Sequence, residues 1–253
     1  MSPIVESNPK KFWNRRSKTF PRYSPGEDQF EAGLLRLIGE QGIAFEGRSV
    51  LDVGCGCGMY TIRLAQAAAR VTALDISDEM LSILKRDAEA EGLSNLEYVN
   101  ADWLDFRAAE PYDVVFCSMT PALSSAEGRL KALGLAREWL VFIGNSGLMC
   151  SEATAGLYER FGVSPKAFDS GPEMRAWLDG RGLEYFYRPV KGQWVKLGSK
   201  SEMVELGLIS LENYGIDPDP DEVADYLEQY RVDDDLYQDQ TPYHLELIIW
   251  RNS

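Results

Sequence analysis

The sequence predicts an α/β fold, in which helices cover both faces of a doubly wound, mostly parallel sheet of about seven strands. Three observations support this fold. A short apolar strand at Ser49–Val53 leads directly into glycines at every second position and then into a helix from Tyr60. Segments of strand and helix periodicity alternate from there to residue 144. A last apolar segment at 243–250 has the pattern of a strand that closes the sheet. The 253 residues suffice for one such domain.

The N-terminal part is predicted to be an arm followed by a helix, together residues 1–45. Residues 1–26 are rich in proline, basic and aromatic side chains, which predicts an irregular arm. Its basic side chains, with no acid between them, are Lys10, Lys11, Arg15, Arg16, Lys18 and Arg22. Two hypotheses remain open for them: they cover the active site or bind an anionic substrate, or they lie on the acidic body of the same chain. From Asp28 to Gln41 apolar residues recur at helical spacing, and Gly42 ends that helix.

The glycine run Gly54-Cys55-Gly56-Cys57-Gly58 is the feature around which the chain is organised. Glycine permits left-handed backbone angles and lets a ligand approach the main chain closely. A dinucleotide fingerprint has the spacing G-x-G-x-x-G, whereas this run is G-x-G-x-G and follows a carboxylate, Asp52, inside the strand. Negative charge attracts a sulfonium cofactor that carries an ammonium group, and repels a pyrophosphate. The run with Asp52 resembles motif I of the class I S-adenosylmethionine-dependent methyltransferases.

This resemblance implies that the loop wraps the amino-acid end of the cofactor, with Asp52 on its ammonium side. The second strand, 71–76, contains Asp75, which follows Asp52 by 23 residues. An acid at this place accepts both hydroxyls of a ribose in nucleotide-binding folds generally. The resemblance places Ile76 on the adenine and Met80 near it, although core packing would explain Met80 equally well. Ser77 is a suitable N-cap for a helix from Asp78 to about Glu91.

The third and fourth predicted strands supply the rest of the resemblance. Leu96–Ala101 is followed by Asp102 and Trp103, which by resemblance bind the adenine amino group and complete the ring pocket. The fourth strand lies within 111–123 and ends beside the cofactor's sulfur. Amino-methylating nucleic-acid enzymes carry Asn or Asp, then Pro-Pro and an aromatic residue, at this point. This chain departs from that pattern, so Met119, Thr120 and Pro121 are predicted to face a different substrate, with a plain loop as the alternative.

The arm resembles, more loosely, the segment that precedes many small-molecule methyltransferase domains. On that resemblance Arg16 and Tyr23 are candidates to contact the cofactor's carboxylate, and surface anchoring is the alternative. The predicted cofactor-binding residues are therefore Asp52, Gly54, Cys55, Gly56, Gly58, Asp75, Ile76, Met80, Asp102, Trp103, Ser118, Arg16 and Tyr23. Residues 46–147 form the predicted cofactor-binding core.

The C-terminal half, 148–253, belongs to the same single predicted domain 1–253 and carries a helical insertion at about 199–232. Periodicity predicts a helix at Leu123–Glu138, a strand at Trp139–Gly144, a helix at Ser170–Gly180, a strand at Leu183–Pro189, helices at Ser201–Tyr214 and Pro218–Tyr230, and a strand at Tyr243–Trp250. By resemblance the last strand is antiparallel. His244, the only histidine, alternates with apolar positions there, which favours a structural role.

Composition excludes several classes of protein. The net charge is −14, and ten carboxylates with one arginine lie between Asp217 and Asp239, so an extended nucleic-acid binding surface is not expected.

Two of the four cysteines lie inside the glycine loop, where a disulfide partner is not expected to reach with good geometry. The C-x-C pair has no further metal ligands at a suitable spacing in the sequence. We therefore expect reduced thiols and no metal. No membrane-length apolar run or signal-peptide pattern is present, so the expected location is cytoplasmic.

The predicted function is methyl transfer from S-adenosylmethionine to a small molecule, without nucleic-acid or membrane partners. In-line displacement mainly requires alignment of the reactants. A hydroxyl acceptor would also need a base, and Glu152, Tyr60 and Cys117 are equal candidates. Three alternatives remain: a catalytically silent cofactor-binding protein that acts through a partner at the acidic segment, an NAD(P)-dependent oxidoreductase, and an arsenite methyltransferase that uses Cys117 and Cys150. The glycine spacing and Asp52 oppose the oxidoreductase.

Overall fold

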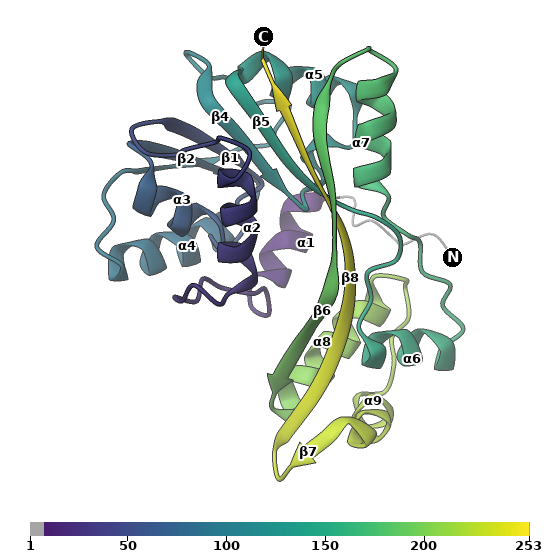
Figure 1. Ribbon diagram of the computed structural model, residues 1–253. Helices are drawn as coiled ribbons and strands as arrows, with labels where there is room; N and C mark the ends of the chain where they lie inside the picture. Colours follow the sequence, from purple (N-terminus) through teal and green to yellow (C-terminus); the bar gives the residue numbers. More distant parts are fainter. Residues whose placement is uncertain (1–7, 253) are drawn as a thin grey trace.

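The computed structural model describes residues 8–252, so residues 1–7 of the predicted arm lie outside the described part. Its single sheet has the strand order β3-β2-β1-β4-β5-β8-β6, with a short eighth strand, β7, paired to β8 (Figure 1). The strands are β1 (Ser49–Val53), β2 (Arg70–Asp75), β3 (Leu96–Asn100), β4 (Tyr112–Ser118), β5 (Ala136–Asn145), β6 (Tyr185–Gly198), β7 (Arg231–Asp233) and β8 (Leu236–Arg251). The α-helices are α1 (Pro9–Arg16), α2 (Phe30–Gly39), α3 (Thr61–Ala67), α4 (Asp78–Ala90), α5 (Ala126–Leu135), α6 (Glu152–Arg160), α7 (Ser170–Asp179), α8 (Lys200–Glu212) and α9 (Pro220–Leu227).

Strands β1 to β5 are parallel, and β8 runs antiparallel to both of its long neighbours, β5 and β6. This confirms the predicted doubly wound fold and the antiparallel last strand. Side chains alternate between the faces as the pleat requires. Val50 joins the cluster beneath α2 and α3, and Leu51 joins the cluster beneath α5 and α7. The carboxyl ends of the parallel strands therefore form one edge of a sheet that is buried on both faces.

The arm contains a helix, which corrects the prediction of an irregular segment. Asn8 caps α1 by accepting a hydrogen bond from the Lys11 N–H at 3.1 Å, and Pro9 occupies the first turn, where its missing N–H costs nothing. No residue of α1 is fully buried. Because the helix has no apolar stripe, its pattern in the sequence is that of a polar loop.

The boundary between α5 and β5 also differs from the prediction. The helix ends at Leu135 rather than Glu138, and the strand starts at Ala136 rather than Trp139. Ala136 is buried and pairs with Tyr112 of β4, while Arg137 donates to Asp113 at 2.5 Å. These tertiary contacts extend the strand into residues that have helical periodicity.

Beyond the sheet, β6 and β8 continue as a long antiparallel two-stranded ribbon (Figure 1), called the hairpin below although α8, α9 and β7 separate its strands in the sequence. Leu245 of β8 is level with Asn145 at the carboxyl end of β5, so residues 236–244 extend past the carboxyl edge. The predicted strands at 183–189 and 243–250 cover only the half of the hairpin that lies in the sheet. The outer half is mostly polar and lacks a clear apolar alternation.

Helices α6, α8 and α9 pack together against the outer half of this hairpin, and we call these three helices the cap. The cap has its own apolar cluster, which includes Leu157, Leu211, Val223 and Tyr237. The sequence predicted α8 and α9 with boundaries shifted by a few residues, but not α6 or β7. No helix among residues 8–252 combines the length and apolar character that crossing a membrane requires.

Candidate functional site

The glycine loop is fixed between the loop after β4 and helix α4. Gly54 and Gly58 have φ angles of +71° and +90°, in the left-handed region that favours glycine. A Cβ on Gly54 would overlap the Thr120 side chain, and one on Gly58 would overlap Leu84. The backbone of this loop therefore comes closer to its neighbours than any larger residue would allow.

Asp52 lies beneath the loop and is 3% exposed. Its Oδ2 accepts a hydrogen bond from the Thr61 hydroxyl at 2.6 Å. Burial raises the pKa of Asp52 to about 7; the Thr61 hydrogen bond opposes this rise and the charge of Asp75 adds to it. A cationic ligand beside Asp52 would stabilise the carboxylate form, so this acid fits the ammonium or sulfonium group of the predicted cofactor.

Asp75 connects the end of β2 to the same loop. Its two carboxylate oxygens accept hydrogen bonds from the Gly56 N–H at 2.9 Å and the Ser77 N–H at 2.8 Å. Burial raises its pKa, and these backbone donors oppose that rise. Each oxygen keeps a lone pair for a further donor. Asp75 can therefore accept the two hydroxyls of a ribose without releasing the loop.

An aromatic ring of the arm, Phe20, covers the loop. Its Cε1 lies 3.2 Å from the place where a Cβ of Gly56 would be, and the Met80 sulfur lies 3.8 Å from the same place. The Tyr23 hydroxyl accepts from Gln66 of α3 at 3.1 Å, and the Arg63 guanidinium is 5.3 Å from its ring. Contact of Tyr23 with a cofactor remains a prediction, whereas the sequence analysis did not name Phe20, whose only signal is its place in the aromatic arm.

The basic side chains of the arm divide into two kinds. Lys10, Arg15 and Arg22 form ion pairs with Asp78, Glu212 and Asp87 respectively, as the acidic-body hypothesis predicts. Arg16 has no ion pair among residues 8–252, and its guanidinium makes one long hydrogen bond, of 3.5 Å, to Thr19. Burial lowers the pKa of Arg16, and the electrostatic effect of Tyr158 of α6 opposes this change. Arg16 is therefore available to an anion.

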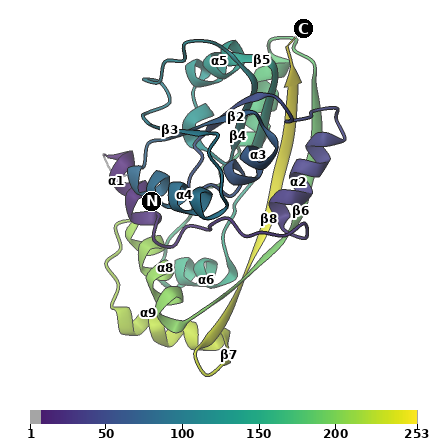
Figure 2. The same ribbon diagram turned by 90° about the vertical axis from the view of Figure 1, so that its left-hand side faces the viewer.

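Hydrogen bonds hold α1 across the start of α4. The Ser77 hydroxyl, which caps α4, also donates to Asn14 Oδ1 at 2.7 Å, and the Asn14 amide donates to Asp78 at 2.9 Å. Figures 1 and 2 both show α1 beside α4, and Arg15 of α1 pairs with Glu212 of α8. These contacts bring Arg16 and Phe20 to the carboxyl edge of the sheet.

Only some of the residues predicted to bind the adenine lie close to the glycine loop. Met80 is buried, and Ile76 is half-buried at the end of β2. Asp102 is exposed, and its Oδ1 accepts from the Leu104 N–H at 2.8 Å. Trp103 is buried under the start of α5, and its indole N–H donates to the Gly128 carbonyl at 3.1 Å. Contact of Asp102 and Trp103 with a cofactor remains a prediction.

The loop after β4 lies against the glycine loop. Met119 has a φ of +47°, the only positive φ of a non-glycine residue among the described ones, and its N–H donates to Ile143 at 2.7 Å. Such a conformation costs of order 1–3 kcal/mol. Thr120 begins the turn at Pro121 by accepting from the Ala122 N–H at 3.3 Å, and its side chain touches Gly54. The residues predicted to face the substrate thus border the cofactor loop.

The four cysteines are free thiols. Burial raises the pKa of Cys117 well above its usual value, and that of Cys150 to about 11, so neither is a ready thiolate at neutral pH. Within residues 8–252 no group of three or more His, Cys, Asp or Glu side chains could hold a metal ion.

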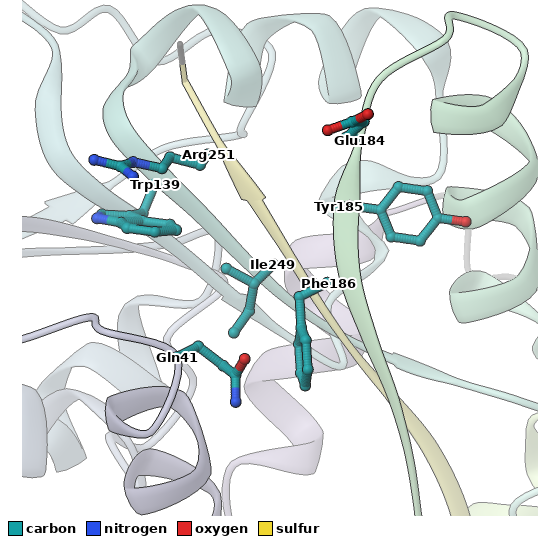
Figure 3. Close-up of a pocket in the computed structure, with 7 residues that line it drawn as sticks. All are labelled: Gln41, Trp139, Glu184, Tyr185, Phe186, Ile249 and Arg251. Atoms are coloured by element: carbon teal, nitrogen blue, oxygen red, sulfur yellow. The ribbon is translucent and has the colours of Figure 1, made fainter.

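An open hollow at the opposite edge of the sheet is separate from this site. It lies where β5 and β6 begin and β8 ends (Figure 3), and its lining residues are Gln41, Trp139, Glu184, Tyr185, Phe186, Ile249 and Arg251. Ligands of open α/β sheets bind at the carboxyl ends of the strands. The glycine loop, not this hollow, is therefore the candidate functional site.

Comparison with known proteins agrees with that choice. Residues 50–141 match the family model described as a methyltransferase domain. The ubiquinone biosynthesis O-methyltransferase of Acinetobacter baylyi is 31% identical over 109 residues, which cover 42% of this chain and 44% of that protein. The protein of the same name from Actinobacillus pleuropneumoniae serotype 5b is 39% identical over 89 residues, covering 33% of this chain and 38% of that one. The chain thus spans less than half the length of these curated relatives.

Solved structures extend the likeness to the whole fold. Magnesium protoporphyrin IX methyltransferase from Synechocystis PCC 6803 with bound SAH superposes with a TM-score of 0.55 at 17% identity, over 95% of this chain and 97% of that one. The same enzyme with bound SAM gives a TM-score of 0.52 at 16% identity, over 95% and 94% of the two chains. At these identities the likeness concerns the fold.

Proposed function

We propose that this chain is a class I, S-adenosylmethionine-dependent methyltransferase that transfers a methyl group from S-adenosylmethionine to a small-molecule acceptor. The match of residues 50–141 to a methyltransferase domain and the fold shared with a solved methyltransferase support this. One observation carries the proposal: two buried acids, Asp52 and Asp75, flank a glycine loop whose backbone takes left-handed φ angles. A cofactor with a cationic amino acid at one end and a ribose diol beside it satisfies both acids. A pyrophosphate on the same loop would meet both negative charges.

Each side chain of the site has a separate role in this proposal. Asp52, held by Thr61, orients the ammonium group, and Asp75 accepts the ribose hydroxyls. Arg16 binds the carboxylate, and Phe20 excludes water from the glycine loop. The bound cofactor supplies a methyl group already activated on a sulfonium. The protein's contribution is then alignment of the reactants, which is worth roughly 7–11 kcal/mol in favourable cases.

The acceptor in this proposal binds between the loop at residues 118–121 and the cap. The curated relatives are named O-methyltransferases, which makes hydroxyl compounds the first class to screen. Among the candidate bases, the pKa values of Tyr60 and Cys117 are both raised by burial, so both keep their protons at neutral pH and neither is in the form that can accept one. An acceptor that is acidic enough to ionise on its own, such as a phenol, suits the site better than an aliphatic alcohol. A cytoplasmic location without nucleic-acid partners is part of the same proposal.

A thermal-shift titration with S-adenosylmethionine, S-adenosylhomocysteine, NAD and NADP tests the cofactor. A ligand at a hundred times its Kd adds about 2.7 kcal/mol to stability, which raises Tm by roughly 5–10 °C in a chain of this size. We expect a shift with the two sulfur nucleosides only. A shift with NAD or NADP instead would reject the proposal in favour of an oxidoreductase.

Transfer itself is tested with cofactor carrying a labelled methyl group and a panel of phenols, catechols, thiols and amines. Appearance of label on one class of acceptor identifies the reaction. Binding of the cofactor without label transfer to any class would favour a silent cofactor-binding protein.

A further inference from the structure

Three buried oxygen atoms near the site have no hydrogen-bond partner within the described chain. They are the Tyr60 hydroxyl, the Ser118 hydroxyl and the side-chain carbonyl oxygen of Asn145. Tyr60 as a whole is only 6% exposed. A buried polar atom without a partner is costly and rare in native proteins, so each needs a physical explanation.

The three oxygens come from one face of the sheet at its carboxyl edge. Ser118 is the last residue of β4 and pairs with Ile143 of β5, two residues before Asn145. Since side chains two residues apart share a face, Ser118 and Asn145 both lie on the face of Ile143. The Tyr60 ring packs on that face too, 5.1 Å from the ring of Phe116.

Charged and polar groups surround the Tyr60 hydroxyl. Burial and the charges of Glu31 and Asp52 raise its pKa, and the nearby Ser118 hydroxyl opposes the rise. Asp52 lies beneath the glycine loop, so the Tyr60 hydroxyl is within electrostatic reach of the acid that the proposed function assigns to the cofactor. The one positive group that acts on it is Arg63, whose guanidinium donates to the Ser24 and Gly26 carbonyls at 2.7 and 3.0 Å. This corner of the site is rich in acceptors and carries negative charge.

We propose that the side-chain oxygens of Tyr60, Ser118 and Asn145 recognise the methyl-bearing sulfonium of S-adenosylmethionine and distinguish it from the neutral thioether of S-adenosylhomocysteine. The inference rests on the proposed function, which places the cofactor's sulfur at the end of β4. A methyl group on a cationic sulfur has polarised C–H bonds, which make weak hydrogen bonds to oxygen. The product has lost both the methyl group and the charge, so the same oxygens hold it less tightly.

Isothermal titration calorimetry with S-adenosylmethionine, S-adenosylhomocysteine and sinefungin tests this selectivity without any acceptor. Sinefungin carries an amino group in place of the methyl group and donates strong N–H hydrogen bonds from the same position. In Tyr60→Phe we expect S-adenosylmethionine to bind about two- to fivefold more weakly, sinefungin to weaken more, and S-adenosylhomocysteine to bind as before. Ser118→Ala should change the three affinities in the same order.

Tyr112→Phe is the matched control. Tyr112 is also buried, but its hydroxyl donates to Thr72 at 3.1 Å in the cluster on the opposite face of the sheet. We expect Tyr112→Phe to lower Tm and to leave the ratio of the two cofactor affinities unchanged. Tyr60→Phe, which removes an unpartnered hydroxyl, should melt at the wild-type temperature or above in the absence of ligand.

Two outcomes would overturn the proposal. If S-adenosylmethionine and S-adenosylhomocysteine weaken equally in Tyr60→Phe and Ser118→Ala, or if neither changes, the oxygens do not distinguish the sulfonium, while wild-type binding would still support the proposed function. If the wild-type protein binds none of the three compounds, the proposed function fails and the inference fails with it. Should Tyr60→Phe not fold, Ser118→Ala decides the question by the same ratio.

Discussion

Replacing Asp52 with asparagine should raise the stability of the free protein and weaken its binding of the cofactor. The carboxylate is almost wholly buried, and its one side-chain partner is the Thr61 hydroxyl. Asparagine is isosteric and keeps an oxygen that can accept this hydrogen bond. The substitution therefore removes the charge while retaining the local packing.

The size of the effect follows from the pKa of Asp52, which burial raises from 3.8 to about 7. Each pKa unit corresponds to about 1.36 kcal/mol, so the ionised carboxylate costs about 4 kcal/mol above pH 7. Because the folded state binds the proton more tightly than the unfolded state, this cost is absent below pH 4 and grows as the pH rises to 7. Asp52→Asn should thus match the wild type at pH 4 and exceed its Tm by roughly 8–16 °C at pH 8.

Cofactor binding should respond in the opposite direction, because a cationic ligand requires the ionised carboxylate. With a pKa of about 7, Asp52 is mostly ionised at pH 8 and mostly protonated at pH 6, so wild-type affinity for S-adenosylhomocysteine should fall about tenfold between them. Above about pH 8 the affinity should fall again as the ligand's own amino group loses its proton. Asp52→Asn should bind weakly throughout and lose the acid limb of the profile.

Scanning calorimetry of the free protein and titration calorimetry with S-adenosylhomocysteine, each from pH 5 to 8.5, provide the measurements. A variant that is less stable than wild type at pH 8 would refute the burial argument. A variant that retains the acid limb would show that a group other than Asp52 controls the pH dependence. This second result would separate Asp52 from the ammonium site.

Three further predictions concern other parts of the site and the fold. Asp75→Ala should weaken S-adenosylhomocysteine by about 1–3 kcal/mol, roughly 5- to 150-fold in Kd, and an unchanged Kd in calorimetry would remove Asp75 from the site. Phe20→Ala should raise that Kd at least fivefold while its control Tyr23→Ala does not, because the Phe20 ring lies against Gly56 whereas the Tyr23 hydroxyl bonds to Gln66 of α3; equal effects would mean that the arm acts only as a whole. Glu246→Gln should cost about 1–3 kcal/mol of stability in urea unfolding, because Glu246 is 2% exposed and receives two hydrogen bonds from Arg175, at 2.8 and 3.0 Å; cofactor affinity should not change.

Elements with a strong local signal were predictable from the sequence. The bounds of strand β1 were predicted to the residue. Ser77 was correctly predicted to cap α4, because a serine side chain just before a helix accepts a hydrogen bond from the first turn. The outer half of the β6–β8 hairpin escaped prediction, since its order depends on pairing between distant segments and on the cap beneath it. Helix α6 was missed because its apolar residues are few and bury against α8, far along the chain.

The contrast between local signals and contacts of distant segments also explains which site residues could be predicted from the sequence. Asp52, Asp75 and the glycines occupy fixed places relative to β1 and β2, so their spacing carries the information. Phe20 reaches the loop through a chain of tertiary contacts, and no spacing within the sequence specifies it. Tyr60 belongs to the glycine segment, yet its importance appears only once Ser118 and Asn145 are seen on the same face.

The two hypotheses for the basic arm describe different residues of one helix. Asn14 holds α1 to the start of α4, and Arg15 pairs with Glu212 of α8, so α1 joins the cofactor core to the cap. Arg16 is adjacent to Arg15 but bonds only to the Thr19 hydroxyl, with no carboxylate within ion-pair distance in the described chain. Lys10, Arg15 and Arg22 thus fix the arm on the acidic body of the protein. In the proposed function that attachment positions Arg16 and Phe20 for the cofactor, so the same arm would be anchored by some of its side chains and bind the ligand with others.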